Sequence, residues 1–138
     1  MRLHIFAQTF RQNWSGIMLN VAKLKEVFPT DTFDVDTVLY QQGDESGDGF
    51  IIQQGQVELT SLVDGQETMV ATFYANEVFG IYKTLFDSDG RRFTATVKEK
   101  SIITRIPEQF LTDRISASDS FIIHCFRQWP NLEKQIRN

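Results

Sequence analysis

Hydrophobic residues recur with two different periods along this chain, and the change of period divides it into three parts. Up to residue 30 the apolar residues have near-helical spacing, and that spacing returns after Pro107. Between residues 31 and 106 they alternate with polar residues over short runs that end in Gly or Asp, as in strands joined by turns. We therefore expect one domain over residues 1–138, with N-terminal helices at 1–30, a β-barrel at 31–106 and C-terminal helices at 107–138.

Seven short strands are predicted in the middle part. Their ranges are Thr32–Val35, Val38–Gln42, Phe50–Gln53, Val57–Val63, Thr68–Tyr74, Phe93–Lys98 and Ile102–Ile106. The pair Asp64-Gly65 predicts a hairpin, because both residues can adopt positive φ. Strands of this length and spacing indicate an antiparallel barrel or sandwich. Alternation assigns its core to Val38, Tyr40, Phe50, Ile52, Val57, Leu59, Val70 and Phe73.

Prolines and capping residues mark the predicted helices. The segment IYKTLF after Gly80 interrupts the strands and is about one and a half helical turns long. Pro107 suits the first turn of a short helix, PEQFLTDRI. Ser118 or Asp119 can cap the last helix, and Pro130 predicts that this helix is kinked or ends.

Composition narrows the class of protein. The chain has 138 residues, a net charge of −4 and a pI near 5.1, so we expect no nucleic-acid binding by this chain alone, because phosphate neutralisation needs a basic excess. Its one cysteine, Cys125, excludes an internal disulfide. No apolar run approaches the roughly 20 residues needed to cross a bilayer, and the first residues lack the pattern of a signal peptide. We expect a cytoplasmic protein without membrane insertion.

Several glycines and aromatic residues in the strand region stand at the spacings of a known family. They are Gly43-Asp44, Phe50-Ile51, Gly55-Gln56-Val57, Asn76 to Ile81 (NEVFGI) and Arg92 to Thr96 (RFTAT). Over roughly residues 20–128 the chain resembles the cyclic-nucleotide-binding domain family of catabolite-activator-type transcription factors and kinase regulatory subunits. The resemblance implies a mainly β fold with flanking helices: an antiparallel β-roll or jelly-roll barrel with N-terminal helices, a short phosphate-cassette helix and C-terminal helices.

The resemblance also implies a pocket for a sugar phosphate. In this family the amides of the short helix hold the phosphate, an Arg neutralises it, and a Glu just after the Phe-Gly pair accepts a hydrogen bond from the ribose. Carried over, the candidate anion or nucleotide pocket consists of Phe79, Gly80, Ile81, Tyr82, Arg91, Arg92, Thr94 and Ala95.

Two recognition groups of that pocket are replaced here. The Glu position is Ile81, which accepts no hydrogen bond, and counting back from Ala95 the Arg position is Phe93. Arg91 and Arg92 lie just before it, but adjacent strand residues face opposite sides, so Arg92 takes over that position only if the loop shifts register. The two arginines therefore either hold an anion or are solvated loop charges. If they hold an anion, Lys83 adds positive potential near the short helix.

No set of residues indicates catalysis or a metal. Asp44, Glu45 and Asp48 share a turn, but their spacing does not match the calcium-loop pattern. His124 and Cys125 are neighbours on a predicted helix, where they point about 100° apart, which does not suit one shared metal. We expect a protein that is not an enzyme and that requires no metal or other cofactor. The small molecule that the resemblance suggests is a cyclic nucleotide.

The last helix carries an apolar stripe with two interpretations. The first is packing on the domain's own barrel; the second is a homodimer or protein-partner interface. A second such stripe, Leu3, Phe6 and Phe10, lies near the N-terminus. The candidate interface residues are Phe121, Ile122, Cys125, Phe126 and Trp129.

Three functions follow from these observations. The first is a regulatory module of this family in which cyclic-nucleotide binding is weak or lost. The second is a working cyclic AMP or cyclic GMP sensor, such as the effector part of a transcription regulator. A small anionic ligand is a further expected partner of the pocket. The third is a protein-interaction or dimerisation module. Ile81 and Phe93 favour a damaged pocket over a working one.

Overall fold

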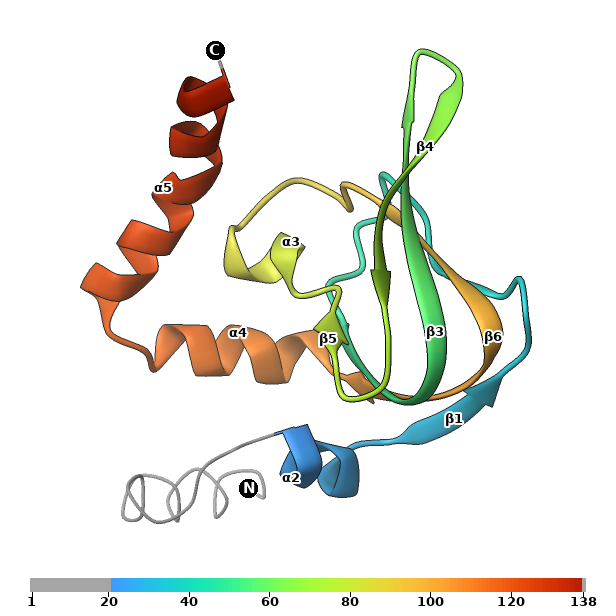
Figure 1. The fold of residues 1–138 in the computed structure, drawn as a ribbon. Coiled ribbons are helices and arrows are strands. Elements are labelled where there is room, and N and C mark those ends of the chain that lie inside the picture. The colour runs from blue at the N-terminus through green and yellow to red at the C-terminus, as the bar shows by residue number, and fades with distance from the viewer. Residues whose placement is uncertain (1–20, 138) are drawn as a thin grey trace.

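The computed structural model describes the backbone of residues 21–137 and the side chains of residues 21–130. In chain order the elements are α2 (Val21–Val27), β1 (Thr30–Phe33), β2 (Val38–Tyr40), β3 (Gly49–Val63), β4 (Gln66–Phe73), β5 (Val78–Phe79), α3 (Tyr82–Leu85), β6 (Thr94–Ile106), α4 (Glu108–Ser116) and α5 (Ser120–Arg137). Figure 1 shows the strands on one side and α3, α4 and α5 on the other. The predicted stripe at Leu3, Phe6 and Phe10 lies outside the described residues.

The strands form one antiparallel sheet of six strands, in the order β1-β6-β3-β4, with β2 on β6 and β5 on β3. The predicted mainly antiparallel β fold with flanking helices is confirmed. Two predicted strand pairs are instead continuous: β3 runs through Gly55 and β6 runs through Ser101. Gly55 has φ +119°, and its missing side chain leaves room for Ser101, whose hydroxyl lies where a Cβ would be. The glycine therefore bends the strand without ending it.

Strict alternation assigned two residues wrongly to the core. Val38 and Val70 are about half exposed. In the β3–β4 pair Leu59 faces Ala71 and Thr60 faces Met69, so Val70 is the extra residue of a bulge. The register of β2 on β6 also shifts, between Val38 and Tyr40. A bulge changes which side a residue faces, which a fixed period of two does not take into account.

The core has two parts on either side of the sheet. Stacked aromatic rings fill the first, with Phe79 placed 5.3 Å from Phe50 and 5.5 Å from Phe73 between centroids. The second joins Ile51 of β3 and Ile106 of β6 to α2 and α4 through the edge-to-face pair Phe28 and Phe110. The first part forms the floor of the site described below.

The helix predictions are confirmed in most respects. Asp64 and Gly65 form the predicted turn with positive φ, and α4 begins just after Pro107. The Asp119 carboxylate accepts hydrogen bonds from the amides of Phe121 and Ile122, so Asp119 is the cap of α5. Of the two outcomes predicted at Pro130, a kink or an end, the end is wrong, since α5 continues to Arg137. None of the described helices is long and apolar enough to span a bilayer.

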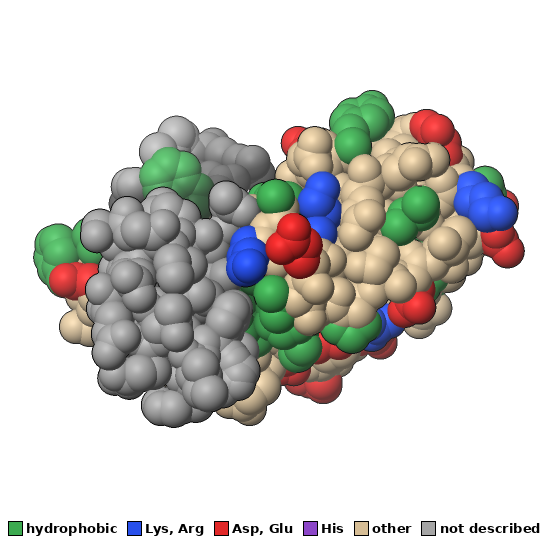
Figure 2. Space-filling view, turned by 90° about the horizontal axis from the view of Figure 1, so that it is seen from below, with side chains coloured by type: hydrophobic (Ala, Val, Ile, Leu, Met, Phe, Trp, Pro, Cys, Tyr) green, Lys and Arg blue, Asp and Glu red, His purple; other side chains and the backbone are tan. Residues whose placement is uncertain are grey.

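Charged side chains are mixed on the part of the surface that is described. Figure 2 views the molecule from below, where Lys and Arg side chains alternate with Asp and Glu and small groups of hydrophobic residues lie between them. One of the charged contacts is the surface pair of Lys23 and Glu26 on α2, 3.8 Å apart. Exposed pairs of this kind contribute little to stability.

Candidate ligand pocket

A pocket of about 350 Å³ lies between the sheet and α3, within the usual range of small-molecule sites. Strands β3, β4 and β5 form its floor, α3 forms one wall, and the loop before β6 forms another. The lining residues are Tyr40, Leu59, Val70, Ala71, Phe73, Val78, Phe79, Gly80, Ile81, Tyr82, Lys83, Leu85, Phe86, Arg91, Arg92 and Phe93.

The lining combines apolar and basic side chains. Ten of these residues have apolar side chains, three are basic, and none of the described lining residues is acidic. No Asn, Gln, Ser or Thr side chain belongs to the lining either. The pocket is therefore apolar with a positive potential, although the chain as a whole carries a charge of −4.

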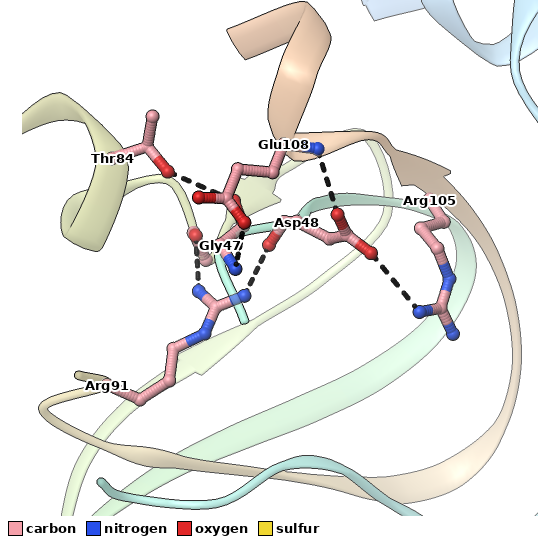
Figure 3. Close-up of polar contacts among 7 residues, drawn as sticks. Gly47, Asp48, Thr84, Arg91, Arg105 and Glu108 are labelled. Carbon is pink, nitrogen blue, oxygen red and sulfur yellow. Dashed lines mark hydrogen bonds and ion pairs between the residues drawn. The ribbon is translucent and has the colours of Figure 1, made fainter. Parts of the chain in front are cut away.

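Arg91 is the buried cation at the base of the pocket. Its residue is 5% exposed, and its guanidinium donates to the carbonyl oxygens of Gly80 at 2.5 Å and Asp48 at 2.6 Å (Figure 3). It also lies 3.9 Å above the Tyr40 ring. Burial lowers the pKa of Arg91, while Tyr40 and Asp48 oppose the change. The guanidinium keeps its charge, because arginine does not lose its proton in proteins.

Main-chain bonds fix Arg91 in this position. The Gly43 amide donates to the Arg91 carbonyl at 2.8 Å, and the Arg91 amide donates to the Asp44 carbonyl at 2.7 Å. Gly90, with φ +74°, allows the loop to approach Gly43 closely, since a Cβ on Gly90 would lie 3.1 Å from the Gly43 carbonyl oxygen. The loop before β6 is thus attached to the turn between β2 and β3.

Residues 91–93 precede the strand, because β6 begins at Thr94. The alternation rule applied to them in the sequence does not hold there, and Arg91, Arg92 and Phe93 all line the same pocket. Phe93 packs against the aromatic core. Arg92 and Phe93 are thus in the case for which the sequence analysis made an exception, because strand alternation does not apply to them.

Arg92 lies in an open environment. It is exposed, and its guanidinium donates to the Tyr82 hydroxyl at 2.8 Å and lies 5.3 Å from the centre of the Tyr82 ring. Its neighbour Lys83 on α3 also lines the pocket. These two side chains are the pocket's accessible positive charges.

Of the other residues predicted for the pocket, four line it and two do not. Phe79, Gly80, Ile81 and Tyr82 line the pocket. Thr94 and Ala95 do not: the Thr94 hydroxyl accepts a hydrogen bond from the Gln42 amide, and Ala95 is completely buried in the core. Ile81 is the residue before α3, where the resemblance leads one to look for an acid.

A polar cluster behind the pocket connects the turn before β3 to both neighbouring helices (Figure 3). The Glu108 carboxylate accepts from the Gly47 amide at 3.0 Å, and the Asp48 carboxylate accepts from the Glu108 amide at 2.8 Å. The Thr84 hydroxyl of α3 donates to the Gly47 carbonyl at 3.1 Å. We call this the Asp48 cluster; its members are Gly47, Asp48, Thr84, Arg91, Arg105 and Glu108.

Sequence reasoning did not find this cluster. In the sequence Asp48 belongs to an acidic turn, whereas in the structure its carboxylate accepts a hydrogen bond from the Glu108 amide of α4 and forms an ion pair with Arg105 at 3.3 Å. Asp44 likewise accepts from the Gln41 amide. Among the described residues no group of three or more His, Cys, Asp or Glu side chains is arranged to hold a metal ion. The partner residues, Thr84 and Glu108, are 37 and 61 positions away from Gly47, beyond the range of a local motif.

Tyr40 lies between the cluster and the pocket. It is buried, it stacks on Phe50 at 5.8 Å between ring centroids, and it lies under the Arg91 guanidinium. Burial raises the pKa of Tyr40 to about 12, and Arg91 lowers it by a smaller amount. The phenol is therefore neutral at physiological pH.

The apolar stripe of α5 does not pack on the barrel. Phe121 is 69% exposed, Phe126 51% and Trp129 55%, and Ile122 and Cys125 are exposed too. The opposite face of α5 makes the internal contacts, with Ile123 half-buried and the Arg127 side chain bonded to the Leu85 carbonyl of α3 at 3.1 Å. The expectation that the stripe covers its own barrel is wrong.

Fold and pocket together define a regulatory β-roll domain with a pocket of small-molecule size beside its short helix. The chain belongs to the cyclic nucleotide-binding domain family, whose model matches residues 30–118. The predicted resemblance is confirmed.

Individual relatives support the same fold. An uncharacterized protein of Haemophilus influenzae is 29% identical over 101 residues, which are 72% of this chain and 78% of that protein. The EAL enzyme Bd1971 with bound cAMP and cyclic-di-GMP has a TM-score of 0.65 and 23% identity over 71% of this chain. The Thermus thermophilus catabolite activator protein has a TM-score of 0.61 and 19% identity over 88% of it. This chain covers 26% of the EAL enzyme chain and 56% of the Thermus chain.

Proposed function

We propose that this chain is a non-enzymatic regulatory domain in which binding of cyclic nucleotides is weak or lost. The observation that carries the proposal is the lack of a carboxylate or amide side chain in the described lining of the pocket, where Tyr40 and Tyr82 carry the only side-chain hydroxyls. Ile81 occupies the position where the family resemblance implies an acid for the ribose, and no carboxylate or amide side chain replaces it. A buried ribose hydroxyl without an acceptor loses its hydrogen bond to water and gains none, which costs about 1 to 3 kcal/mol for each group.

Two backbone carbonyls near this position are already used by the protein. The Gly80 carbonyl, which lies next to Ile81, accepts from the Arg91 guanidinium, and so does the Asp48 carbonyl. Arg91 thus uses two of its donors within the protein. A cyclic nucleotide entering this pocket would meet positive charge for its phosphate but hydrocarbon around its sugar.

The test is calorimetric titration of the chain with cyclic AMP and cyclic GMP, and in parallel thermal unfolding with each nucleotide at millimolar concentration. We expect no binding with a Kd below about 100 μM and no resolved rise in Tm. Ligand at 100 times its Kd would add roughly 2.7 kcal/mol of stability, so micromolar binding is readily detected. Micromolar binding of either nucleotide by the unchanged chain would overturn the proposal.

A substitution at position 81 tests whether the missing acid is the cause of weak cyclic-nucleotide binding. Ile81→Glu restores an acceptor at the position before α3, and Ile81→Gln is its control with similar size and no charge. We expect Ile81→Glu to improve cyclic AMP affinity about tenfold, which corresponds to one charged hydrogen bond. No gain in a folded Ile81→Glu variant would show that the missing acid is not what limits binding.

We also propose that α5 is the interface of a homodimer. The observation that favours this second function is the exposure of the stripe, because four large hydrophobic side chains on one face of a helix form a patch that monomers rarely present to water. The opposite face of α5 is already bonded to α3 through Arg127, so the stripe remains available for a second copy.

The dimer is tested by measuring mass in solution by light scattering. Phe126→Asp should convert a dimer to a monomer, whereas His124→Asp, an exposed position on the same helix outside the stripe, should not. A monomeric unchanged chain, or a dimeric Phe126→Asp variant, would contradict this proposal.

A further inference from the structure

The pocket beside α3 retains the features that attract an anion, although its acceptors for a sugar are missing. Three of its lining residues are basic, and none of those described is acidic. The guanidinium of Arg92 and the side chain of Lys83 both belong to its wall, and Arg92 is exposed. A negative group entering the pocket therefore meets basic side chains and no carboxylate of the described lining.

Arg91 adds a donor in the same place. Its Nε atom is buried, and it has no hydrogen-bond partner among the described residues, although the two terminal nitrogens bond to carbonyl oxygens. A buried donor without an acceptor is a rare and costly arrangement, so a basic residue of the lining keeps one hydrogen-bonding group unused. This donor belongs to a residue that is 95% buried and lines the pocket, so it does not depend on surface charges alone.

The rest of the lining suits an apolar body. Phe73, Phe79 and Phe93 supply aromatic surface, and Leu59 and Ala71 supply aliphatic surface on β3 and β4. Among the described lining residues the hydroxyls belong only to Tyr40 and Tyr82, and the Tyr82 hydroxyl already accepts from Arg92. Burial of hydrocarbon against such walls contributes about 25 cal/mol for each Å² removed from water.

We propose that this pocket binds a small apolar molecule with one anionic group, of the class of aromatic monocarboxylates. The inference rests on the proposed function, since it names what the same pocket binds in place of a cyclic nucleotide. The ring system lies against the phenylalanines of the floor, and the carboxylate lies toward Arg92 and Lys83. A volume of about 350 Å³ accommodates a ligand of one or two rings.

The test compares two probes of the same shape by calorimetry, naphthalene-2-carboxylate and neutral naphthalene-2-methanol, on the full chain. We expect the carboxylate to bind about tenfold more tightly than the alcohol, as for one charge-assisted interaction. Arg92→Gln and Lys83→Gln should each remove most of that preference and leave the affinity for the alcohol unchanged. Lys100→Gln, an exposed position on β6 outside the pocket, is the matched control. Equal affinity for the two probes would overturn the anionic part of the proposal.

A second pair of variants locates the binding. Ala71→Trp places a large ring in the pocket, whereas Thr72→Trp places it on the other face of β4, because neighbouring strand residues point in opposite directions. Val70→Trp, at an exposed lining position, serves if Ala71→Trp does not fold. We expect the pocket-filling variants to lose carboxylate binding and Thr72→Trp to retain it. Carboxylate binding that survives a filled pocket would place the site elsewhere and refute the proposal.

The result also separates this inference from the function it rests on. If neither the carboxylate nor the cyclic nucleotides bind, the proposed loss of nucleotide binding stands and the inference fails. If cyclic AMP or cyclic GMP binds at micromolar concentration and Ala71→Trp abolishes that binding, both fail together.

Discussion

Arg91 and Arg92 are adjacent in the chain, yet they belong to two regions with different roles. Arg91 is part of the Asp48 cluster, where its guanidinium bonds to main-chain carbonyls of two separate turns. Arg92 lies at the pocket, where its guanidinium donates a hydrogen bond to the Tyr82 hydroxyl and its side chain is exposed to water. The Asp48 cluster bonds separate turns of the domain to one another, and the pocket exposes the positive charge of Arg92. The comparison shows that an arginine in a family's ligand-binding segment can become part of the framework while its neighbour keeps an open position.

The largest expected effect comes from removing the buried arginine. Arg91→Ala leaves the Gly80 and Asp48 carbonyls without their donor and opens a space above Tyr40. We expect the free energy of unfolding to fall by about 3 to 5 kcal/mol, as for a broken buried charged network. Urea denaturation followed by circular dichroism measures it. A loss below about 1 kcal/mol would show that Arg91 is not structural.

Tyr40 gives a pH-dependent test of the same region. The folded state holds the phenol proton more tightly than the unfolded state, because burial raises the pKa of Tyr40 to about 12 from an ordinary value of 10.0. The resulting stabilisation is fully present below pH 10 and is lost as the pH rises toward 12. It amounts to roughly 2 to 3 kcal/mol. Urea midpoints at pH 9 and pH 11.5 should show this loss in the unchanged chain and a smaller one in Tyr40→Phe; equal losses would contradict the assignment.

Gly47 tests how closely the cluster is packed. A Cβ at this position would lie 2.6 Å from the Glu108 Cδ atom and 2.8 Å from the Thr84 hydroxyl oxygen. We expect Gly47→Ala to destabilise the fold by about 2 kcal/mol, in the range of overpacking. Glu108→Ala removes the closest atoms, so in that background the same substitution should cost less. Additive effects in this double-mutant cycle would argue against a steric conflict with Glu108.

The smallest effect is expected at Arg92. Its side chain is exposed, and its hydrogen bond to the Tyr82 hydroxyl lies at the surface. Arg92→Ala should change the free energy of unfolding by less than about 0.5 kcal/mol, as for surface positions away from buried networks. Measured beside Arg91→Ala under the same conditions, it gives the contrast between the two regions directly. Similar losses for both variants would remove the distinction.

Much of the fold could be predicted from local patterns. The hairpin at Asp64-Gly65 and the cap at Asp119 depend on residues within three positions of each other, and both are present. The bulge that exposes Val70 could not be predicted, because it depends on how β4 pairs with β3 rather than on β4 itself. Continuity of β3 through Gly55 depends in the same way on Ser101, 45 positions from the amide of Gln56 that it bonds.

The structure has a pocket among the residues to which the resemblance pointed, but the contacts within it could not be predicted. The Phe-Gly pair and the arginines before β6 do line one pocket, which the family resemblance suggested. The use of Arg91 by the main chain was not foreseen, because it requires the Asp48 and Gly80 carbonyls to meet from different turns. Local sequence shows which donors a segment carries, whereas only the folded chain shows which acceptors reach them first.

The attachment of the Arg91 main chain to Gly43 and Asp44 has a practical consequence. Because the backbone of Arg91 is anchored to that turn, a conformational change in the residues just before Gly90 need not move Arg91 or Arg92. Asp87 and Asp89 are exposed in that stretch, which follows α3 directly. An Asp89→Cys variant in which Cys125 is replaced by serine carries a single thiol for a fluorescent dye. Such a dye would report changes in the position of α3 by its fluorescence and leave the architecture intact.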